Sequence, residues 1–319
     1  MRSSKALSAD PITPLVAGAR SALERAAATI GLDLADAELA HCGHNVGFTL
    51  PGAGLFARVG PPGSQDKARN AVVCSRYFHQ QNLPVVPPIE GRHALASTAY
   101  GPVTFWPLLH PVDAPVDFRW LGRTLRRLHD LPGRGMPPAQ RTSRRDLGSR
   151  VGRFLQSRPD PSVRRKIEAL VRELDECALV LPTLAVGPVH GDPYPSNVLA
   201  TAAGYRLLDY DGSGIGHQLL DLAPIFAAHK RFGLGQADLK AFVDGYGSDP
   251  RALPEFGAVL RLRELGLVTW LLKFAGHLEA YYDELEWRLA TLDSTDDWTD
   301  LGHGVVDAAG ATEGSACRM

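Results

Sequence analysis

The stretch that decides the fold is PVHGDPYPSNVLA, residues 188–200, which sets prolines and polar side chains between two apolar runs. Asp192 and Asn197 lie in it with four residues between them, and Asp209 follows in LLDYDG. The residues from Val198 to Leu208 are predicted to form a short hairpin with its turn at 201–204. Since antiparallel pairing returns a chain to its starting end, we expect the three side chains to converge.

Two carboxylates and an amide oxygen are suitable ligands for Mg²⁺, which completes its shell with water and phosphate oxygens. Phosphoryl transfer needs this ion, a residue that orients the acceptor hydroxyl and groups that hold the donor phosphates. The plainer alternative is that Asp, Asn, Gly and Pro only form turns, and it applies most to Asp211, Ser213 and His217 taken singly. The spacing of Asp192, Asn197 and Asp209 favours phosphoryl transfer.

The combination of HGDPYPSNVLA and LLDYDGSGIGHQLLDLA resembles the aminoglycoside phosphotransferase and choline kinase-like family. The resemblance implies an α+β, two-lobed protein-kinase-like fold, with a small antiparallel N-terminal sheet and one helix, and a larger, mainly helical C-terminal lobe. The matching positions are His190, Gly191, Asp192, Asn197, Asp209 and Asp221-Leu222-Ala223.

The resemblance also implies a role for each matching side chain. Asp192 is similar to the catalytic base that positions the acceptor hydroxyl, and Asn197 and Asp209 are similar to the Mg²⁺ ligands. His190 and Asp221 are expected to orient the loop, Asp221 by binding its backbone groups.

The N-terminal part reads as a small sheet with helices. An Ala-rich helix is expected within 12–34. A strand, a turn and a second strand are then expected from residue 39, with Pro51 to Gly54 as the hairpin connection before a third strand at 55–59. A helix is predicted at 65–82, and further strands at 84–89 and 102–106.

From Asp117 onward the pattern becomes mainly helical, and the longest apolar periodicity covers 259–292. The tail is small and polar, and we expect it to be disordered. The predicted organisation is a nucleotide-binding lobe at 1–107, a helical lobe with the catalytic loop and acceptor site at 108–301, and the tail at 302–319.

The donor nucleotide is expected to bind in the N-terminal lobe. The turn around Gly43 and Asn45 allows close backbone approach to a phosphate. The resemblance places the hinge near Phe105 and Trp106, where backbone and aromatic groups would meet a purine. Both aromatic residues could equally be core residues.

One position departs from the family pattern. The family carries a phosphate-binding lysine on the third strand, and this sequence has Arg58, which keeps the charge and can bind phosphate with two hydrogen bonds. The glutamate expected to hold that cation falls on Ala71, and the nearest acids are Asp66 and Glu90. Either another group orients Arg58, or the nucleotide is held differently.

The acceptor is expected to bind in the helical lobe. From Gly233 onward there are 15 Asp and Glu residues against 7 Lys and Arg, which suits a cationic acceptor. Ordinary solvated helix surfaces and aromatic core residues are the competing interpretations. The candidate acceptor-binding residues are Glu279, Tyr282, Asp283 and Glu286.

Composition excludes several other classes. The net charge of −1 gives no sign of nucleic-acid binding, and no apolar run is long enough for a membrane span. The first residues lack the apolar core of a signal peptide, so a cytoplasmic location is expected. The four cysteines have no metal-type spacing, and the oligomeric state cannot be read.

The sequence therefore predicts a Mg²⁺-dependent O-phosphotransferase that uses ATP, with GTP as an alternative. The expected acceptor is a hydroxyl of an antibiotic, either an aminoglycoside or another sugar- or nucleoside-containing compound, which phosphorylation would inactivate. The richness in Ala, Gly, Arg and Pro is in keeping with this. The alternatives are a metabolic kinase for choline, a sugar or an amino alcohol, and a catalytically silent binding protein of the same fold.

Overall fold

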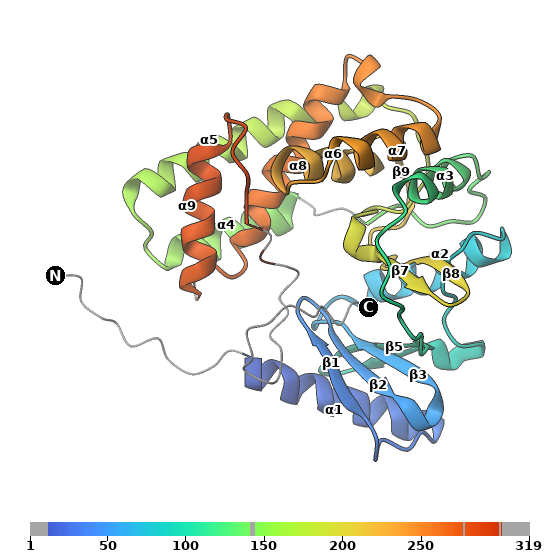
Figure 1. Cartoon of the computed structure of the whole chain (residues 1–319). Helices are drawn as coiled ribbons and strands as arrows, with labels where there is room; N and C mark the ends of the chain where they lie inside the picture. Colours follow the sequence, from blue (N-terminus) through green and yellow to red (C-terminus); the bar gives the residue numbers. More distant parts are fainter. Residues whose placement is uncertain (1–11, 141–143, 277, 300, 302–319) are drawn as a thin grey trace. The chain divides into compact units, whose positions relative to one another are not determined.

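The chain divides into two compact units, each built from separate segments of the sequence (Figure 1). The structure is a computed structural model that describes residues 12–140, 144–276, 278–299 and 301. The predicted tail at 302–319 lies outside the described residues. Within the described residues, the first unit comprises 12–114 and 199–211, and the second comprises 115–198 and 212–301.

The first unit is built on a five-stranded antiparallel sheet in the order β1-β2-β3-β5-β4. The predicted connection between the second and third strands is confirmed, because Pro51–Ala53 forms a single 3₁₀ turn there. Gly54 ends this turn at φ 63°, a left-handed conformation that suits glycine. The strands are β1 (Glu38–Cys42), β2 (Val46–Leu50), β3 (Leu55–Val59), β4 (Leu95–Thr98) and β5 (Gly101–Pro107).

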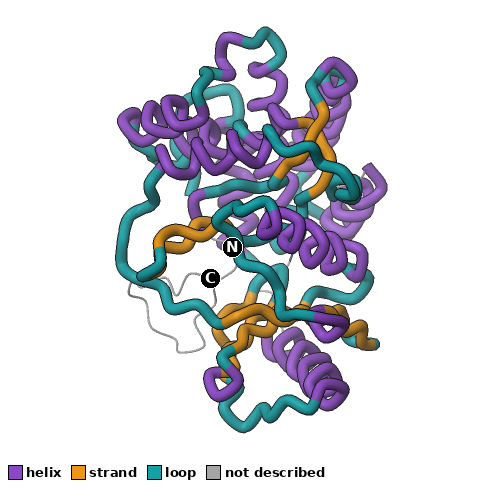
Figure 2. Tube along the Cα trace, turned by 90° about the vertical axis from the view of Figure 1, so that its right-hand side faces the viewer, coloured by secondary structure: helices purple, strands orange, loops and turns teal. Residues whose placement is uncertain are grey.

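Two helices accompany this sheet. Helix α1 (Ile12–Ile30) lies along the sheet in both views (Figures 1 and 2), and its small buried residues, such as Ala22 and Ala26, allow close packing against Phe48 and Phe105. Helix α2 (Gln65–Gln80) follows β3, as the sequence predicts.

The hairpin predicted after the catalytic loop is confirmed as β7 (Val198–Thr201) and β8 (Gly204–Leu207). The strand predicted at 84–89 is wrong. That segment makes one isolated bridge, from Val85 to Leu207, because its three prolines have no N–H to donate to a ladder.

The second unit is mainly helical, and its one small sheet pairs β6 (Val186–Val189) with β9 (Gly214–His217), which the sequence analysis missed. The single long helical pattern at 259–292 divides into two helices, α8 and α9. The helices are α3 (Phe118–His129), α4 (Arg144–Gln156), α5 (Pro161–Ala178), α6 (Ala223–Arg231), α7 (Gln236–Tyr246), α8 (Phe256–Leu271) and α9 (Glu279–Thr291). None of the helices in the described part of the chain is both long and apolar enough to cross a bilayer.

The closest helix packing in the second unit joins α3 to α7. A Cβ added to Gly122 of α3 would stand 2.2 Å from the carbonyl oxygen of Phe242, and one added to Gly245 of α7 would stand 2.2 Å from that of Arg119. Glycines on both helices therefore set this backbone approach, which places His129 of α3 beside Tyr246 of α7.

This packing gives a prediction with a matched control. Gly122→Ala should lower the free energy of unfolding by about 1–3 kcal/mol, because the added methyl overlaps a backbone that cannot yield. Gly148→Ala, in the exposed middle of α4 where a Cβ meets nothing within 4 Å, should stabilise by about 0.5–1 kcal/mol. Urea unfolding measures both, and equal effects would contradict the packing argument.

Candidate functional site

The loop at 190–197, in which the sequence predicts the catalytic residues, follows β6 directly. Its backbone at Gly191 packs so closely that only glycine fits there. Gly191 has φ +96°, and a Cβ there would lie 2.4 Å from the backbone carbon of Gly212. The hydroxyl of buried Ser213 donates to the carbonyl of His190 at 2.7 Å. The loop and the residues after Asp211 therefore form one tight piece of the second unit.

A buried carboxylate anchors the same loop. The two oxygens of Asp221, which is 2% exposed, accept hydrogen bonds from the backbone N–H groups of His190 (2.5 Å) and Gly191 (2.8 Å). His129 contacts the same carboxylate through Nε2 at 3.3 Å, and its Nδ1 lies 2.8 Å from the hydroxyl of Tyr246. Burial raises the pKa of the Tyr246 hydroxyl, which keeps it protonated. The loop backbone is thus tied to α3 and α7.

Asp192 lies next to a cation that sequence reasoning did not single out. The guanidinium of Arg263, on α8, forms an ion pair with Oδ1 of Asp192 at 3.0 Å, and the two side chains are 22% and 31% exposed. Arg263 also lies over the ring of Tyr194, 5.9 Å from its centroid. No local sequence pattern links residues 192 and 263, so only the packing of α8 reveals this pair.

Asn197 is oriented by the loop itself. Its Nδ2 donates to the carbonyl oxygen of Asp192 at 2.9 Å, and its side chain is nearly buried. Pro195 begins the 3₁₀ turn Pro195–Asn197 that carries it. Because the amide nitrogen is engaged, the amide oxygen is the group that remains to bind a metal ion.

Asp209 belongs to the first unit, whereas Asp192 and Asn197 belong to the second, so the convergence of the three stays a prediction. Asp209 adopts φ 62°, a left-handed conformation that Asp tolerates better than most residues. Between it and Asp211, Tyr210 turns into the core, with its ring 6.0 Å from that of Trp106 and its hydroxyl accepting from the N–H of Val86.

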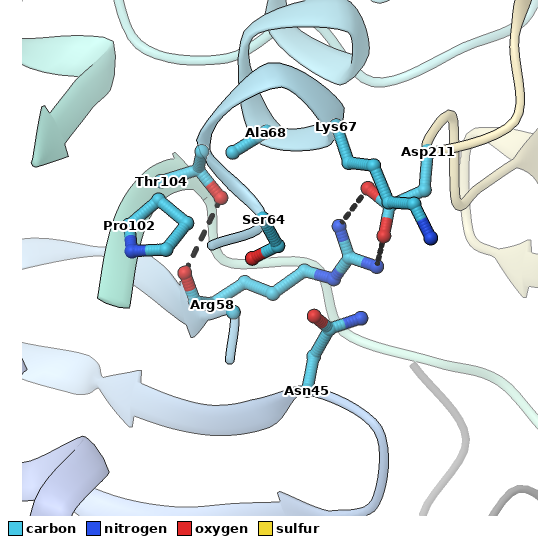
Figure 3. Close-up of a pocket in the computed structure, with 9 residues that line it drawn as sticks. Asn45, Arg58, Ser64, Lys67, Ala68, Pro102, Thr104 and Asp211 are labelled. Atoms are coloured by element: carbon cyan, nitrogen blue, oxygen red, sulfur yellow. Dashed lines mark hydrogen bonds and ion pairs between the residues drawn. The ribbon is translucent and has the colours of Figure 1, made fainter. Parts of the chain in front are cut away.

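Arg58 has acidic partners, and they are not on α2 (Figure 3). Its Nη1 and Nη2 meet the two oxygens of Asp211 at 2.5 and 2.6 Å, and Nη2 meets Asp209 at 3.0 Å. Burial disfavours both charged forms. The mutual attraction outweighs it, so the pKa of Asp211 lies below its ordinary value and that of Arg58 above. The cation on β3 is therefore held by the segment after β8.

Asp211 is the residue that sequence reasoning missed, having taken it as a turn former. The available signal was the pair Asp209 and Asp211 around a single aromatic residue, together with an arginine on β3 and an alanine at 71. A buried guanidinium that finds no acid on the neighbouring helix needs a carboxylate from another part of the chain. The sequence could have raised Asp211 as a candidate on that ground.

The other predicted nucleotide residues lie in the first unit. The N–H of Gly43 donates to the carbonyl of Asn45, which closes the turn between β1 and β2. The amide of Asn45 lies against the guanidinium of Arg58, and with this amide turned over its oxygen accepts from Nε at 3.2 Å. Phe105 is wholly buried in the core of the sheet. Trp106 is nearly buried and donates from Nε1 to the hydroxyl of Thr104.

The predicted acceptor residues all lie on α9. Glu279, Asp283 and Glu286 are exposed, and the ring of Tyr282 stacks on Phe154 at 6.2 Å beside the helical core. Glu284, part of the same acidic run, is instead buried in an ion pair with Arg288 at 2.7 Å. The aromatic rings of Trp270, Phe274 and Tyr281 contact one another.

The donor set fits Mg²⁺ as a partner of phosphate. Within the part of the chain that the structure describes, no cluster of three His, Cys, Asp or Glu side chains could hold a metal alone. Asp209 and Asn197 would supply one carboxylate and one amide oxygen, and Mg²⁺ commonly takes few protein ligands and fills its shell with water and phosphates. The chemistry of these two side chains suits an ion that arrives with a nucleotide, and because they belong to different units, a shared ion stays a prediction.

Comparison with known proteins agrees with this geometry. Residues 44–256, more than half of the chain, match the profile of the phosphotransferase enzyme family. No curated protein matches the sequence.

Solved structures share the fold at low sequence identity. The amicoumacin kinase hAmiN, in complex with AMP-PNP, Ca²⁺ and Ami, is 12% identical with a TM-score of 0.65, over 88% of this chain and 95% of that one. A choline/ethanolamine kinase family protein from Mesorhizobium loti is 16% identical with a TM-score of 0.60 (86% and 94%). The spectinomycin phosphotransferase APH(9)-Ia, with ADP and spectinomycin, is 13% identical with a TM-score of 0.59 (87% and 95%).

The anchoring of the loop can be tested at Asp221. Asp221→Asn removes the charge and one acceptor oxygen, so one buried backbone N–H loses its partner, and the free energy of unfolding should fall by about 1–3 kcal/mol. Asp66→Asn, at a carboxylate that is 82% exposed, should change it by less than about 1 kcal/mol. Urea titrations compare them, and an Asp221 variant as stable as the Asp66 variant would refute the anchor.

Proposed function

As a member of the phosphotransferase enzyme family, the chain is an ATP-dependent enzyme that phosphorylates a hydroxyl group, and we propose that its acceptor is a sugar- or nucleoside-containing antibiotic. The observation that carries the catalytic part is the anchored loop, in which Asp221 holds the backbone before Asp192 and Asn197 bonds the carbonyl of Asp192. The antibiotic part rests on the compounds named with the similar structures.

In this proposal Asp192 binds the acceptor hydroxyl, orients its oxygen for attack and takes its proton. A strongly basic carboxylate is not needed, because the transition state of phosphoryl transfer is loose and positioning dominates. Arg263 pairs directly with Asp192 at 3.0 Å and so fixes the position of its carboxylate. His190 and Asp221 hold the loop in place and do not touch the reacting groups.

Asn197 and Asp209 would hold Mg²⁺ in this proposal. When bound, the ion would supply positive charge that neutralises the phosphates. The chain's own contribution is to aim the two ligands: the loop holds the amide of Asn197, and Arg58 holds the carboxylate of Asp209. The phosphates would lie near Gly43, Asn45 and Arg58, and the purine near the backbone at Phe105 and Trp106. ATP is the expected donor, with GTP as the alternative.

The positive charge of Arg263 beside Asp192 limits which acceptors can bind there. Arg263 would repel an ammonium group placed next to the reacting hydroxyl, so a neutral sugar or nucleoside hydroxyl is favoured there. A cationic aminoglycoside would have to place its ammonium groups farther away, where the exposed acids of α9, Glu279, Asp283 and Glu286, could take part. The same observation speaks for a sugar over choline among metabolic acceptors.

The substrate class is tested with a panel of acceptors. We expect ATP-dependent phosphorylation of at least one antibiotic among aminoglycosides, spectinomycin, nucleoside antibiotics and amicoumacin-type compounds, read as ADP release and as product mass. Choline, ethanolamine, sugars and aminopropanol form the metabolic arm. Turnover of that arm alone would overturn the antibiotic assignment, and nucleotide binding without turnover of any acceptor would favour the silent binding protein.

The role of Asp192 gives a second test on whichever acceptor is turned over. Asp192→Asn should lower kcat by about 10²–10⁴-fold, because the amide cannot accept the hydroxyl proton. Binding of ATP should be retained and the urea midpoint should shift little, since the side chain is partly exposed. Near-native turnover by this variant would show that another group serves as the base.

The metal assignment is tested through the Mg²⁺ dependence of the rate. Asn197→Ala should raise the Mg²⁺ concentration for half-maximal activity by about tenfold or more, because one of two protein ligands is lost. Titration of Mg²⁺ at fixed ATP measures it. An unchanged Mg²⁺ dependence with a lower kcat would instead assign Asn197 to the loop alone.

A further inference from the structure

Protein groups engage most of the N–H donors of the Arg58 guanidinium. It forms two short bonds to Asp211 and one contact to Asp209, and with the amide of Asn45 turned over it also forms a bond from Nε to the amide oxygen. A phosphate bound by both ends of this guanidinium would have to replace charge-assisted hydrogen bonds, which are among the strongest in proteins. Arg58 is therefore better placed to hold two carboxylates than to bind an anion.

The cluster also has the wrong charge for an anion. One arginine with Asp209 and Asp211 carries a net charge of −1, which repels a polyphosphate. A second cation is needed before phosphate and its Mg²⁺ can approach.

Lys67 supplies that cation. It lines the same pocket as Arg58 and Asp211, it is half-buried, and its charge acts on Asp211 (Figure 3). No hydrogen bond or ion pair of its ammonium group is found among the described residues. The other members of this pocket are Asn45, Gly60, Ser64, Ala68, Pro102 and Thr104.

The local backbone favours an anion at the same place. Lys67 is in the first turn of α2, whose N-terminal N–H groups carry partial positive charge. The loop before it is tightly held. A Cβ on Gly101 would lie 2.1 Å from the carbonyl oxygen of Gly60, and a Cβ on Gly60 would lie 2.5 Å from the hydroxyl of Ser64. A rigid loop fixes the start of α2 and hence the base of the Lys67 side chain.

We propose that Lys67 is the residue that binds the nucleotide's phosphate oxygens in this pocket, while Arg58 positions Asp209 and Asp211. The two functions that the family pattern assigns to one strand lysine and its helix acid are divided here among three residues. An ammonium on a flexible stem can turn to a phosphate without breaking an existing bond. This inference rests on the proposed nucleotide site, and it names a contact that the sequence pattern does not indicate.

The test measures nucleotide binding to the full-length protein, so no acceptor has to be known. Lys67→Gln and a matched control, Arg69→Gln, are titrated calorimetrically with ATP, ADP, AMP and adenosine in the presence of Mg²⁺, and with GTP and GDP. Arg69 is on the same helix, is 66% exposed and pairs only weakly with Asp66. We expect Lys67→Gln to weaken ATP and ADP by about tenfold or more while adenosine is unchanged, and Arg69→Gln to match the wild type.

Three outcomes would overturn the inference. ATP affinity unchanged in Lys67→Gln would show that Lys67 does not bind phosphate, while nucleotide binding by the wild type would still support the proposed function. An equal loss for adenosine and ATP in a variant whose thermal unfolding matches the wild type would show that Lys67 shapes the pocket and does not bind phosphate. A wild-type protein that binds no nucleotide of either series would overturn both proposals.

Discussion

The loop at 190–197, to which we assign the catalytic residues, depends on one buried carboxylate. Asp221 accepts hydrogen bonds from two consecutive backbone N–H groups, those of His190 and Gly191, and His129 meets the same group from α3. Without this partner the loop would bury backbone donors at a cost comparable to a lost hydrogen bond each. The same loop requires a glycine at 191, because the backbone there lies too close to Gly212 for any side chain.

In the first unit, the buried cation Arg58 takes its carboxylate partners from a distant segment. An arginine on β3 faces no acid on α2, because position 71 is a fully buried alanine. The carboxylate comes instead from Asp211, just after β8, so the β7–β8 hairpin carries two acids to the sheet. Removing either member of this pair would leave a buried, uncompensated charge. Tyr210 points the opposite way and secures the segment between Phe78 and Trp106.

The helix positions and the catalytic spacing could be predicted because they are local. The helices at α2 and α3 have the expected periodicity, and the side chain of Asp117 accepts from the N–H of Trp120 at the start of α3. The prediction failed at 84–89, where apolar residues suggest a strand. The three prolines there lack the N–H groups that a strand would need. The apolar run at 259–292 gave no sign of the division into α8 and α9, because both helices pack their apolar residues into one core.

The sequence by itself determined the family, the two-part α+β architecture and the spacing of Asp192, Asn197 and Asp209, since each depends on residues close together in the chain. Only the tertiary structure decided which charges meet: Arg58 with Asp211, separated by more than 150 positions, and Arg263 with Asp192. Ion pairs between distant segments leave no periodic pattern, because their partners are chosen by packing. For that reason the sequence indicates phosphoryl transfer, whereas the charged neighbours of Asp192 and Arg58 become visible only in the fold.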